Sequence, residues 1–125
     1  MLLVVFLLVG CRTSGGVSPH PDPLPRGERE EEGLGSYYGA GLQGQLTANG
    51  ERFDKEALTA AHRTLPFGSC VHVESVATGR SVNVRVNDRG PFVADRIIDL
   101  SEAAARALGM ISAGVGQVKL SRCLP

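Results

Sequence analysis

Apolar and polar side chains alternate along residues 71–76 and again along residues 81–87. A period of two places every second side chain on the same face of an extended chain, which indicates β-strands with one face in a hydrophobic core. The connecting residues 77–80 include a glycine and are suited to a tight turn. The pattern therefore predicts a β-hairpin in the second half of the chain.

Shorter runs predict further strands and one helix. We expect strands within residues 35–39, 96–100 and 116–122. Ser101 is a good N-cap for the Ala-rich segment that follows it, and Gly109 is suited to end that helix. Together with the hairpin, this pattern of about six strands and one helix favours a small closed β-barrel over a sandwich.

The segment between the first strand and the hairpin is rich in turn signals. Asn49-Gly50 is a strong one, and residues 65–68 contain both a proline and a glycine. Between these turns we expect one turn of helix at residues 55–58.

The composition limits the classes of protein to consider. A chain of 125 residues suits one domain. The formal net charge is zero, which argues against nucleic acid as the main partner. No spacing of cysteines and histidines resembles a metal site, and no glycine-rich loop resembles a phosphate site. We therefore expect neither a metal nor a cofactor.

The chain begins with an apolar run at residues 2–9, followed by Gly10 and Cys11. As a helix this run would be about 12 Å long, too short to cross a bilayer, but it matches the apolar region of a signal peptide. Residues 8–11 resemble the bacterial lipobox, in which the cysteine is lipidated. We expect residues 1–10 to be a signal peptide and Cys11 to carry a lipid anchor. The alternatives are an uncleaved apolar tail and a free thiol in the core.

Residues 11–33 predict a disordered linker. Alternating prolines favour an extended conformation, and the charged run at residues 28–32 has no apolar surface to bury. Arg12 follows the lipobox instead of the Asp that commonly retains lipoproteins at the inner membrane. We therefore expect a lipid-anchored protein of the bacterial envelope, at the outer membrane and facing the periplasm, with its folded domain at residues 34–125.

Cys70 and Cys123 remain once Cys11 is set aside. Export places a protein where disulfides persist, and each of the two cysteines lies at the edge of an alternating run. Neighbouring strands would bring them together, and closing this loop would contribute about 4 kcal/mol in the chain-entropy model. We expect a disulfide between them; the alternative is two separate buried thiols.

Asp88 is the first candidate for chemistry. It follows the alternating run at residues 81–87 and directly precedes Arg89-Gly90-Pro91. A Gly-Pro turn at a strand end holds a side chain in a restricted pose, which suits a catalytic carboxylate. The alternative is a turn aspartate whose carboxylate accepts a backbone N–H, and the residues alone do not decide between the two.

Several longer motifs resemble the rare lipoprotein A family. In chain order they are SYYG, TANGERFD, LTAAHRTLPFG, VNDRGPF and RIIDLSEAAARALGM, and they extend from about Ser36 to the C-terminus. The resemblance implies a six-stranded double-psi β-barrel with one short helix, a fold shared with expansins. It also implies lytic cleavage of peptidoglycan glycan strands, with a preference for strands that lack stem peptides. We expect the domain to be a monomer.

Lytic cleavage can use one carboxyl group for both proton transfers, as acid first and as base second. The resemblance implies that Asp88 is this group. Glu51 would favour its protonated form or stabilise the cationic sugar. Asp54 would orient His62, and His62 would bond to an acid. The alternatives are a solvated acidic loop and a histidine satisfied in the core.

The resemblance also implies contacts with the substrate. Tyr37 and Tyr38 would stack on sugar rings, with core packing as the alternative. Asn87 and Arg89 would bind sugar hydroxyls, although Arg89 has an alternative ion pair with an aspartate of residues 95–99.

A function from another class stays open at this point. An expansin-like module would bind the wall polysaccharide without cleaving it. The presence of the whole acidic set favours the enzyme.

Overall fold

The computed structural model describes residues 31–124 of the chain. The expected signal peptide, the lipidation of Cys11 and most of the expected linker lie outside the described residues. Within the described range, no helix is long and apolar enough to cross a membrane.

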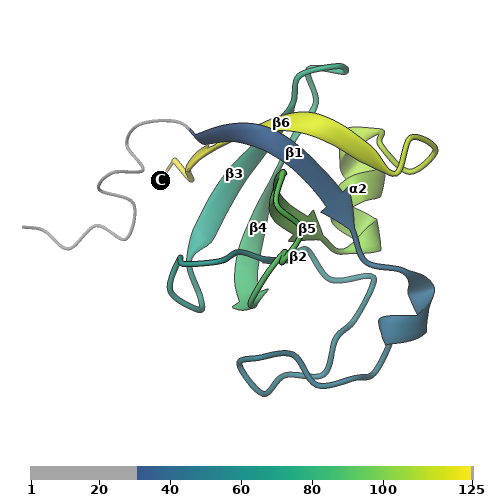
Figure 1. Ribbon diagram of the computed structural model, residues 1–125, viewed down its shortest axis with the longest axis vertical. Coiled ribbons are helices and arrows are strands. Elements are labelled where there is room, and N and C mark those ends of the chain that lie inside the picture. Colours follow the sequence, from purple (N-terminus) through teal and green to yellow (C-terminus); the bar gives the residue numbers. More distant parts are fainter. Residues whose placement is uncertain (1–30, 125) are drawn as a thin grey trace, which may run out of the picture.

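Six strands close into a barrel in the order β1-β5-β2-β4-β3-β6 (Figure 1). The pairs β1–β5 and β2–β4 are parallel, and the other four pairs are antiparallel. The elements are β1 (Glu31–Tyr37), the 3-10 helix η4 (Ala40–Leu42), β2 (Thr59–Ala61), β3 (Cys70–Ser75), β4 (Ser81–Asp88), β5 (Arg96–Leu100), the helix α2 (Glu102–Leu108) and β6 (Val115–Arg122). The expected fold class, a six-stranded barrel with one short α-helix, is confirmed.

The alternating segments form the elements that they predict, and the differences lie where alternation is absent. β3 and β4 form the predicted hairpin, and β5 has the predicted bounds. The pattern missed β2, which is buried at every position and therefore shows no alternation. In place of the expected turn of helix at residues 55–58, the chain forms a hydrogen-bonded turn, in which the Ala57 N–H donates to the Asp54 carbonyl oxygen at 3.0 Å.

β1 begins at Glu31, earlier than the expected start of the domain at residue 34. Its first residues pair with β6, Glu31 opposite Leu120 and Glu32 opposite Lys119. Both glutamate side chains are exposed, so they stay solvated while their backbone joins the barrel. Composition could not reveal this boundary, because backbone pairing does not require an apolar side chain.

The interior of the barrel is filled by the inward side chains of the alternating strands. Its largest buried residues include Val71, Val73, Val84, Val86, Ile98, Leu100, Leu108 and Val118. Gly35 on β1 faces the same space, where a Cβ would lie 3.1 Å from Ile98 Cγ2 and 3.2 Å from Val118 Cγ2. A larger residue at this position would press on both side chains, so the barrel is closely packed around this glycine.

Both predicted caps of α2 are present. The Ser101 hydroxyl accepts a hydrogen bond from the Ala104 N–H at 3.2 Å, and Gly109 ends the helix in the left-handed conformation with a φ of 76°. Ala104, Ala105 and Leu108 bury the inner face of the helix against the barrel core. The helix therefore contributes its inner face to the hydrophobic core of the barrel.

One row of the barrel ladder determines where strand ends meet. Leu100 of β5 pairs with Tyr37 of β1 and with Ala60 of β2, and Ala60 pairs in turn with Val86 of β4. The last residues of β1 and β4 are thereby brought within reach of each other. The long loop after β1 passes below the barrel at this end in Figure 1.

A disulfide joins Cys70, the first residue of β3, to Cys123, which follows β6. Their Cα atoms are 5.7 Å apart, within the range that a disulfide spans. The two strands are antiparallel neighbours, with Val71 opposite Arg122, so strand pairing brings the cysteines together. This is the pairing that the sequence favoured.

Replacing Cys70 and Cys123 together by Ser should lower the free energy of unfolding by about 2–4 kcal/mol, because the unfolded chain regains the entropy that the closed loop removes. Urea unfolding at pH 7 measures this loss. A reductant should destabilise the wild type and leave the double variant unchanged. An equal effect of the reductant on both proteins would show that this disulfide is not the stabilising bond.

Candidate functional site

β4 ends at Asp88, and three hydrogen-bond donors converge on its carboxylate. The backbone N–H groups of Ala48 and Arg89 donate to Oδ1, each at 2.9 Å. The Tyr38 hydroxyl donates to Oδ2 at 2.8 Å. A carboxylate has about four acceptor sites, two on each oxygen, so these contacts leave one site on Oδ2 without a donor among residues 31–124. The group is fixed in one pose and keeps one acceptor site for a substrate.

Tyr38 is anchored at its backbone and at its ring. Its N–H donates to the Leu100 carbonyl oxygen at 3.0 Å, and its ring meets Phe53 edge-on with the centroids 5.0 Å apart. Burial, and then the bond to Asp88, raise the pKa of Tyr38 above its usual range, so the hydroxyl stays neutral and donates. The ring packs on Phe53 and the hydroxyl bonds to Asp88, and the expected stacking of Tyr38 on a sugar ring stays a prediction.

Tyr37 lies on the other side of the strand end. Its ring packs against the hydrophobic core, and its hydroxyl donates to the Ile111 carbonyl oxygen at 2.9 Å. Consecutive strand residues point to opposite faces, so only one of the two tyrosines can reach Asp88. Tyr37 therefore has the alternative role of core packing instead of the expected contact with sugar.

Residues 47–51 form a turn that folds against the end of β4. The Asn49 N–H donates to the Asn87 carbonyl oxygen at 3.2 Å. The Asn49 side-chain oxygen accepts bonds from within the same turn and stabilises its shape. This turn presents the Ala48 N–H to Asp88.

Glu51 lies in the same turn and binds Arg85 of β4 through both carboxylate oxygens. The side-chain amides of Asn49 and Asn87 also donate to it, at 2.9 and 3.2 Å. These bonds, that of Arg85 first, lower the pKa of Glu51 to about 2, so the group is ionised at neutral pH. The two carboxylates share no hydrogen-bond partner among residues 31–124, and the expectation that Glu51 favours a proton on Asp88 stays a prediction.

Asn87 is 2% exposed. Its side chain lies on the same face of β4 as that of Arg85, two residues earlier, and both side chains donate to the Glu51 carboxylate. The expected contact of Asn87 with sugar hydroxyls is therefore corrected: the side chain is buried, and its amide supports Glu51.

The His62 ring lies away from Asp88. Its Nδ1 accepts the backbone N–H groups of Thr64 and Leu65, both at 3.2 Å, so the ring proton is on Nε2. Nε2 lies 3.2 Å from Glu31 Oε1, and this bond lowers the pKa of Glu31 below its usual range. The expected bond from His62 to an acid exists, but the acid is Glu31. The backbone of His62 does reach the site, where its N–H donates to the Asp88 carbonyl oxygen at 3.2 Å.

Asp54 has a local structural role. Its Oδ1 accepts the Glu56 N–H at 3.0 Å, and the residue is exposed. The expected orientation of His62 by Asp54 is corrected, because the His62 ring nitrogens bond to other groups. Among the described residues, no group of three or more His, Cys, Asp or Glu side chains is arranged to hold a metal ion.

Arg89 links the turn after β4 to the loop after β2. Its guanidinium lies over the ring of Phe67, with Cζ 4.0 Å from the centroid, and its Nη1 donates to the His62 carbonyl oxygen at 3.1 Å. These contacts take the place of the alternative ion pair with an aspartate of residues 95–99. Arg89 also touches the site through its backbone N–H on Asp88.

Sequence reasoning missed Arg85 and Glu31 as partners of site residues. For Arg85 a signal was available, because it occupies an outward position of the strand that ends at Asp88. For Glu31 no local signal exists, because its partner His62 is distant in sequence and the charged run around it is typical of a solvated linker.

A family model described as lytic transglycolase matches residues 30–120, nearly the whole described domain. The chain belongs to this lytic transglycolase family. The family resemblance read from the motifs is thereby confirmed, and the closed six-stranded barrel is the double-psi β-barrel that it implies.

Curated relatives match the same part of the chain. The "probable endolytic peptidoglycan transglycosylase RlpA" of Synechocystis sp. is 59% identical over 93 residues, which are 74% of this chain and 29% of the relative. The "endolytic peptidoglycan transglycosylase RlpA" of Campylobacter jejuni is 46% identical over 108 residues, 86% of this chain and 39% of the relative. The chain thus spans less than half the length of these relatives.

Two solved structures have similar folds. The Streptomyces papain inhibitor aligns with a TM-score of 0.59 at 27% identity, over 75% of this chain and 96% of that chain. The apo expansin of Clavibacter michiganensis aligns with a TM-score of 0.59 at 24% identity, over 76% of this chain and 50% of that chain. At this identity the likeness to expansin shows the fold alone.

The interaction of Glu51 with Arg85 should depend on pH. The depressed pKa means that the bonds of Glu51 stabilise the folded protein above about pH 4.5 and are lost as the pH falls toward about 2. A double-mutant cycle of Glu51→Gln and Arg85→Gln should give a coupling free energy of about 0.5–1 kcal/mol at pH 7, because solvent screens this half-exposed pair. In urea unfolding the coupling should shrink below pH 4.5. An equal coupling at pH 7 and pH 2 would contradict this assignment.

Proposed function

We propose that the domain is a lytic transglycosylase that cleaves the glycan strands of peptidoglycan, with Asp88 as the single acid and base. Relatives named endolytic peptidoglycan transglycosylase, up to 59% identical to the chain, support the reaction. The observation that carries the proposal is the Asp88 carboxylate, which three donors fix while one acceptor site on Oδ2 stays open to the substrate.

In the proposed first step, protonated Asp88 gives its proton to the glycosidic oxygen, and the C1–O bond breaks to leave an oxocarbenium-like sugar. In the second step, the C6 hydroxyl of the same sugar attacks C1, and the Asp88 carboxylate takes the hydroxyl proton. The products are a 1,6-anhydro ring and a free hydroxyl on the adjoining sugar. Asp88 ends protonated, as it began, and no water is consumed.

Negative charge develops on Asp88 while its proton leaves. The N–H groups of Ala48 and Arg89 and the hydroxyl of Tyr38 already point at the carboxylate, so they stabilise this charge without reorganisation. The three donors come from separate points of the chain: Tyr38 directly follows β1, Ala48 lies in the turn at residues 47–51, and Arg89 directly follows β4. The reactivity of the acid therefore depends on the closed barrel as a whole.

We assign Glu51 a positioning role in this reaction. Its bonds to Arg85 and Asn87 tie the turn at residues 47–51 to β4, and that turn supplies the Ala48 N–H. Arg85 balances the charge of Glu51, which leaves little field for a cationic sugar in this solvent-exposed setting. The role proposed for Glu51 is thus to fix the turn that holds the acid.

The preferred substrate that we propose is the glycan strand freed of stem peptides, as the family resemblance implies. Comparing the release of 1,6-anhydro ends from intact peptidoglycan and from peptidoglycan stripped of its peptides tests this preference. Equal rates on both substrates would remove it without affecting the proposed reaction.

Asp88→Asn should lower the release of 1,6-anhydro ends by at least about 10²-fold, because an amide cannot supply the proton. Asn is nearly isosteric and keeps an acceptor for the Ala48 and Arg89 N–H groups, so the variant should fold normally. The assay uses the full chain in mild detergent with stripped peptidoglycan, mass spectrometry of the products, and thermal unfolding as the check on folding. A folded, active variant would show that Asp88 is not the acid. If the wild type binds strands but produces no anhydro ends, the domain is an expansin-like binding module instead.

Tyr38→Phe keeps the ring contact with Phe53 and removes only the donor to Asp88 Oδ2. A hydrogen bond to a charged group contributes about 1.5–3 kcal/mol, so kcat should fall about 10- to 100-fold while KM changes little. Tyr37→Phe is the matched control, because it removes the hydroxyl of the neighbouring tyrosine, which bonds to Ile111 and not to Asp88. Equal losses of kcat in the two variants would mean that the Tyr38 hydroxyl does not act through Asp88.

A further inference from the structure

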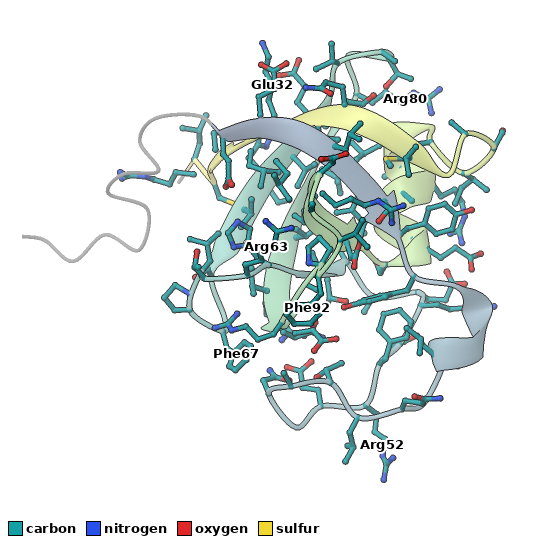
Figure 2. All side chains as sticks on the ribbon, in the orientation of Figure 1. Glu32, Arg52, Arg63, Phe67, Arg80 and Phe92 are labelled. Carbon is teal, nitrogen blue, oxygen red and sulfur yellow. A yellow bond between two sulfur atoms is a disulfide. The ribbon has the colours of Figure 1, made fainter. Side chains whose placement is uncertain are left out.

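Phe92 is 86% exposed, a high value for a large aromatic side chain. It follows Gly90-Pro91 in the turn that begins at Asp88. Single exposed apolar residues are common, but Phe92 has an exposed apolar neighbour in Val93 and a second, partly exposed aromatic residue, Phe67, at the same end of the barrel (Figure 2). An apolar patch directly beside a candidate acid is a feature that solubility does not explain.

The backbone around Phe92 is fixed on both sides by one arginine. Arg63 donates from Nε to the Pro91 carbonyl oxygen and from a terminal nitrogen to the Val93 carbonyl oxygen, both at 2.7 Å. The planar guanidinium holds its donors in a rigid fork, so the two carbonyls cannot move independently. An exposed ring on a mobile loop would lose conformational entropy on binding, whereas this ring is presented on a pre-ordered backbone.

The ring of Phe92 lies back against the turn of Asp88. A Cβ at Gly90 would be 3.3 Å from Phe92 Cε2, and Gly90 has a φ of 126°, which side chains rarely adopt. Glycine therefore leaves room for one edge of the ring beside the turn, while most of the side chain faces solvent. On the other side of the turn, the Arg89 guanidinium covers Phe67.

We propose that Phe92 is a stacking platform for a sugar ring of the glycan strand, next to the glycosidic bond that reaches Asp88, and that Arg63 is its positioning residue. This inference rests on the proposed function and deepens it. Pyranose rings present apolar C–H faces that pack on the electron-rich face of an aromatic ring, while their hydroxyls stay at the rim for hydrogen bonds. The place of Phe92 in the turn of Asp88 identifies the strand that is being cut as its occupant.

The platform acts on a ring that does not react, so it binds the substrate equally in the ground state and in the transition state. Removing such an interaction raises KM and leaves kcat nearly unchanged. This sets Phe92 apart from Asp88 and Tyr38, whose loss lowers kcat.

The test measures binding and cleavage separately. Binding is measured by co-sedimentation of the full chain, in mild detergent and in the Asp88→Asn background, with insoluble peptidoglycan stripped of stem peptides. In this background, Phe92→Ala should weaken binding about 3- to 10-fold. Phe92→Tyr should bind as well as the parent, because the tyrosine ring keeps the stacking face. Val76→Ala is the matched control, since Val76 is an exposed apolar residue beyond β3, 48% exposed, and should change nothing.

Arg63→Ala should weaken binding when Phe92 is present and have no further effect when Phe92 is already Ala, because it acts through that ring. Equal binding of the chains with Phe92 and with Ala at this position would overturn the platform, and so would a failure of the Asp88→Asn chain to bind glycan at all. An additive effect of Arg63→Ala in the two backgrounds would overturn its positioning role.

If binding depends on Phe92 but the wild type makes no anhydro ends, the proposed reaction fails and the platform stands. If the wild type cleaves and Phe92→Ala binds and cleaves as well as its parent, the reaction stands and the platform fails.

Discussion

The parallel pairing of β1 with β5 is the constraint on which the site depends. Tyr37 pairs with Leu100, and the same residue of β5 pairs with Ala60 of β2, which lies beside β4. Through this row Tyr38, the residue directly after β1, reaches Asp88 at the end of β4. A slip of one residue would reverse the faces of the two tyrosines and remove the hydroxyl from the carboxylate.

Two carboxylates from the same end of the barrel have different surroundings, and this difference separates their roles. Glu51 faces a guanidinium and two amides, so its charge is compensated and its pKa is depressed. Asp88 faces two backbone N–H groups and a neutral phenol, with no cationic side chain among these partners. A carboxylate fixed by neutral donors can exchange a proton with a substrate, whereas a carboxylate in an ion pair is suited to hold a loop in place.

The residues with proposed chemical roles lie at the end of β4 or on loops, and the barrel makes those loops rigid. The turn at residues 47–51 is tied to β4 through Glu51 and Asn87, and the turn after Asp88 is clamped by Arg63. Loops positioned by a rigid scaffold commonly carry binding and catalytic groups. Here the clamps are charged or amide side chains that bond to backbone or to carboxylate, so the loops are ordered without being buried.

Local sequence patterns were sufficient for the hairpin, for β5 and for both caps of α2, because alternation, capping and turn chemistry act over a few residues. The motifs also sufficed for the family and its barrel. The partners of the site residues were not predictable in this way. That His62 bonds to Glu31 and not to Asp54, that Tyr38 bonds to Asp88, and that the Asn87 side chain is buried are consequences of barrel closure. They join residues distant in sequence, and only the tertiary structure determines which of several possible donors and acceptors meet.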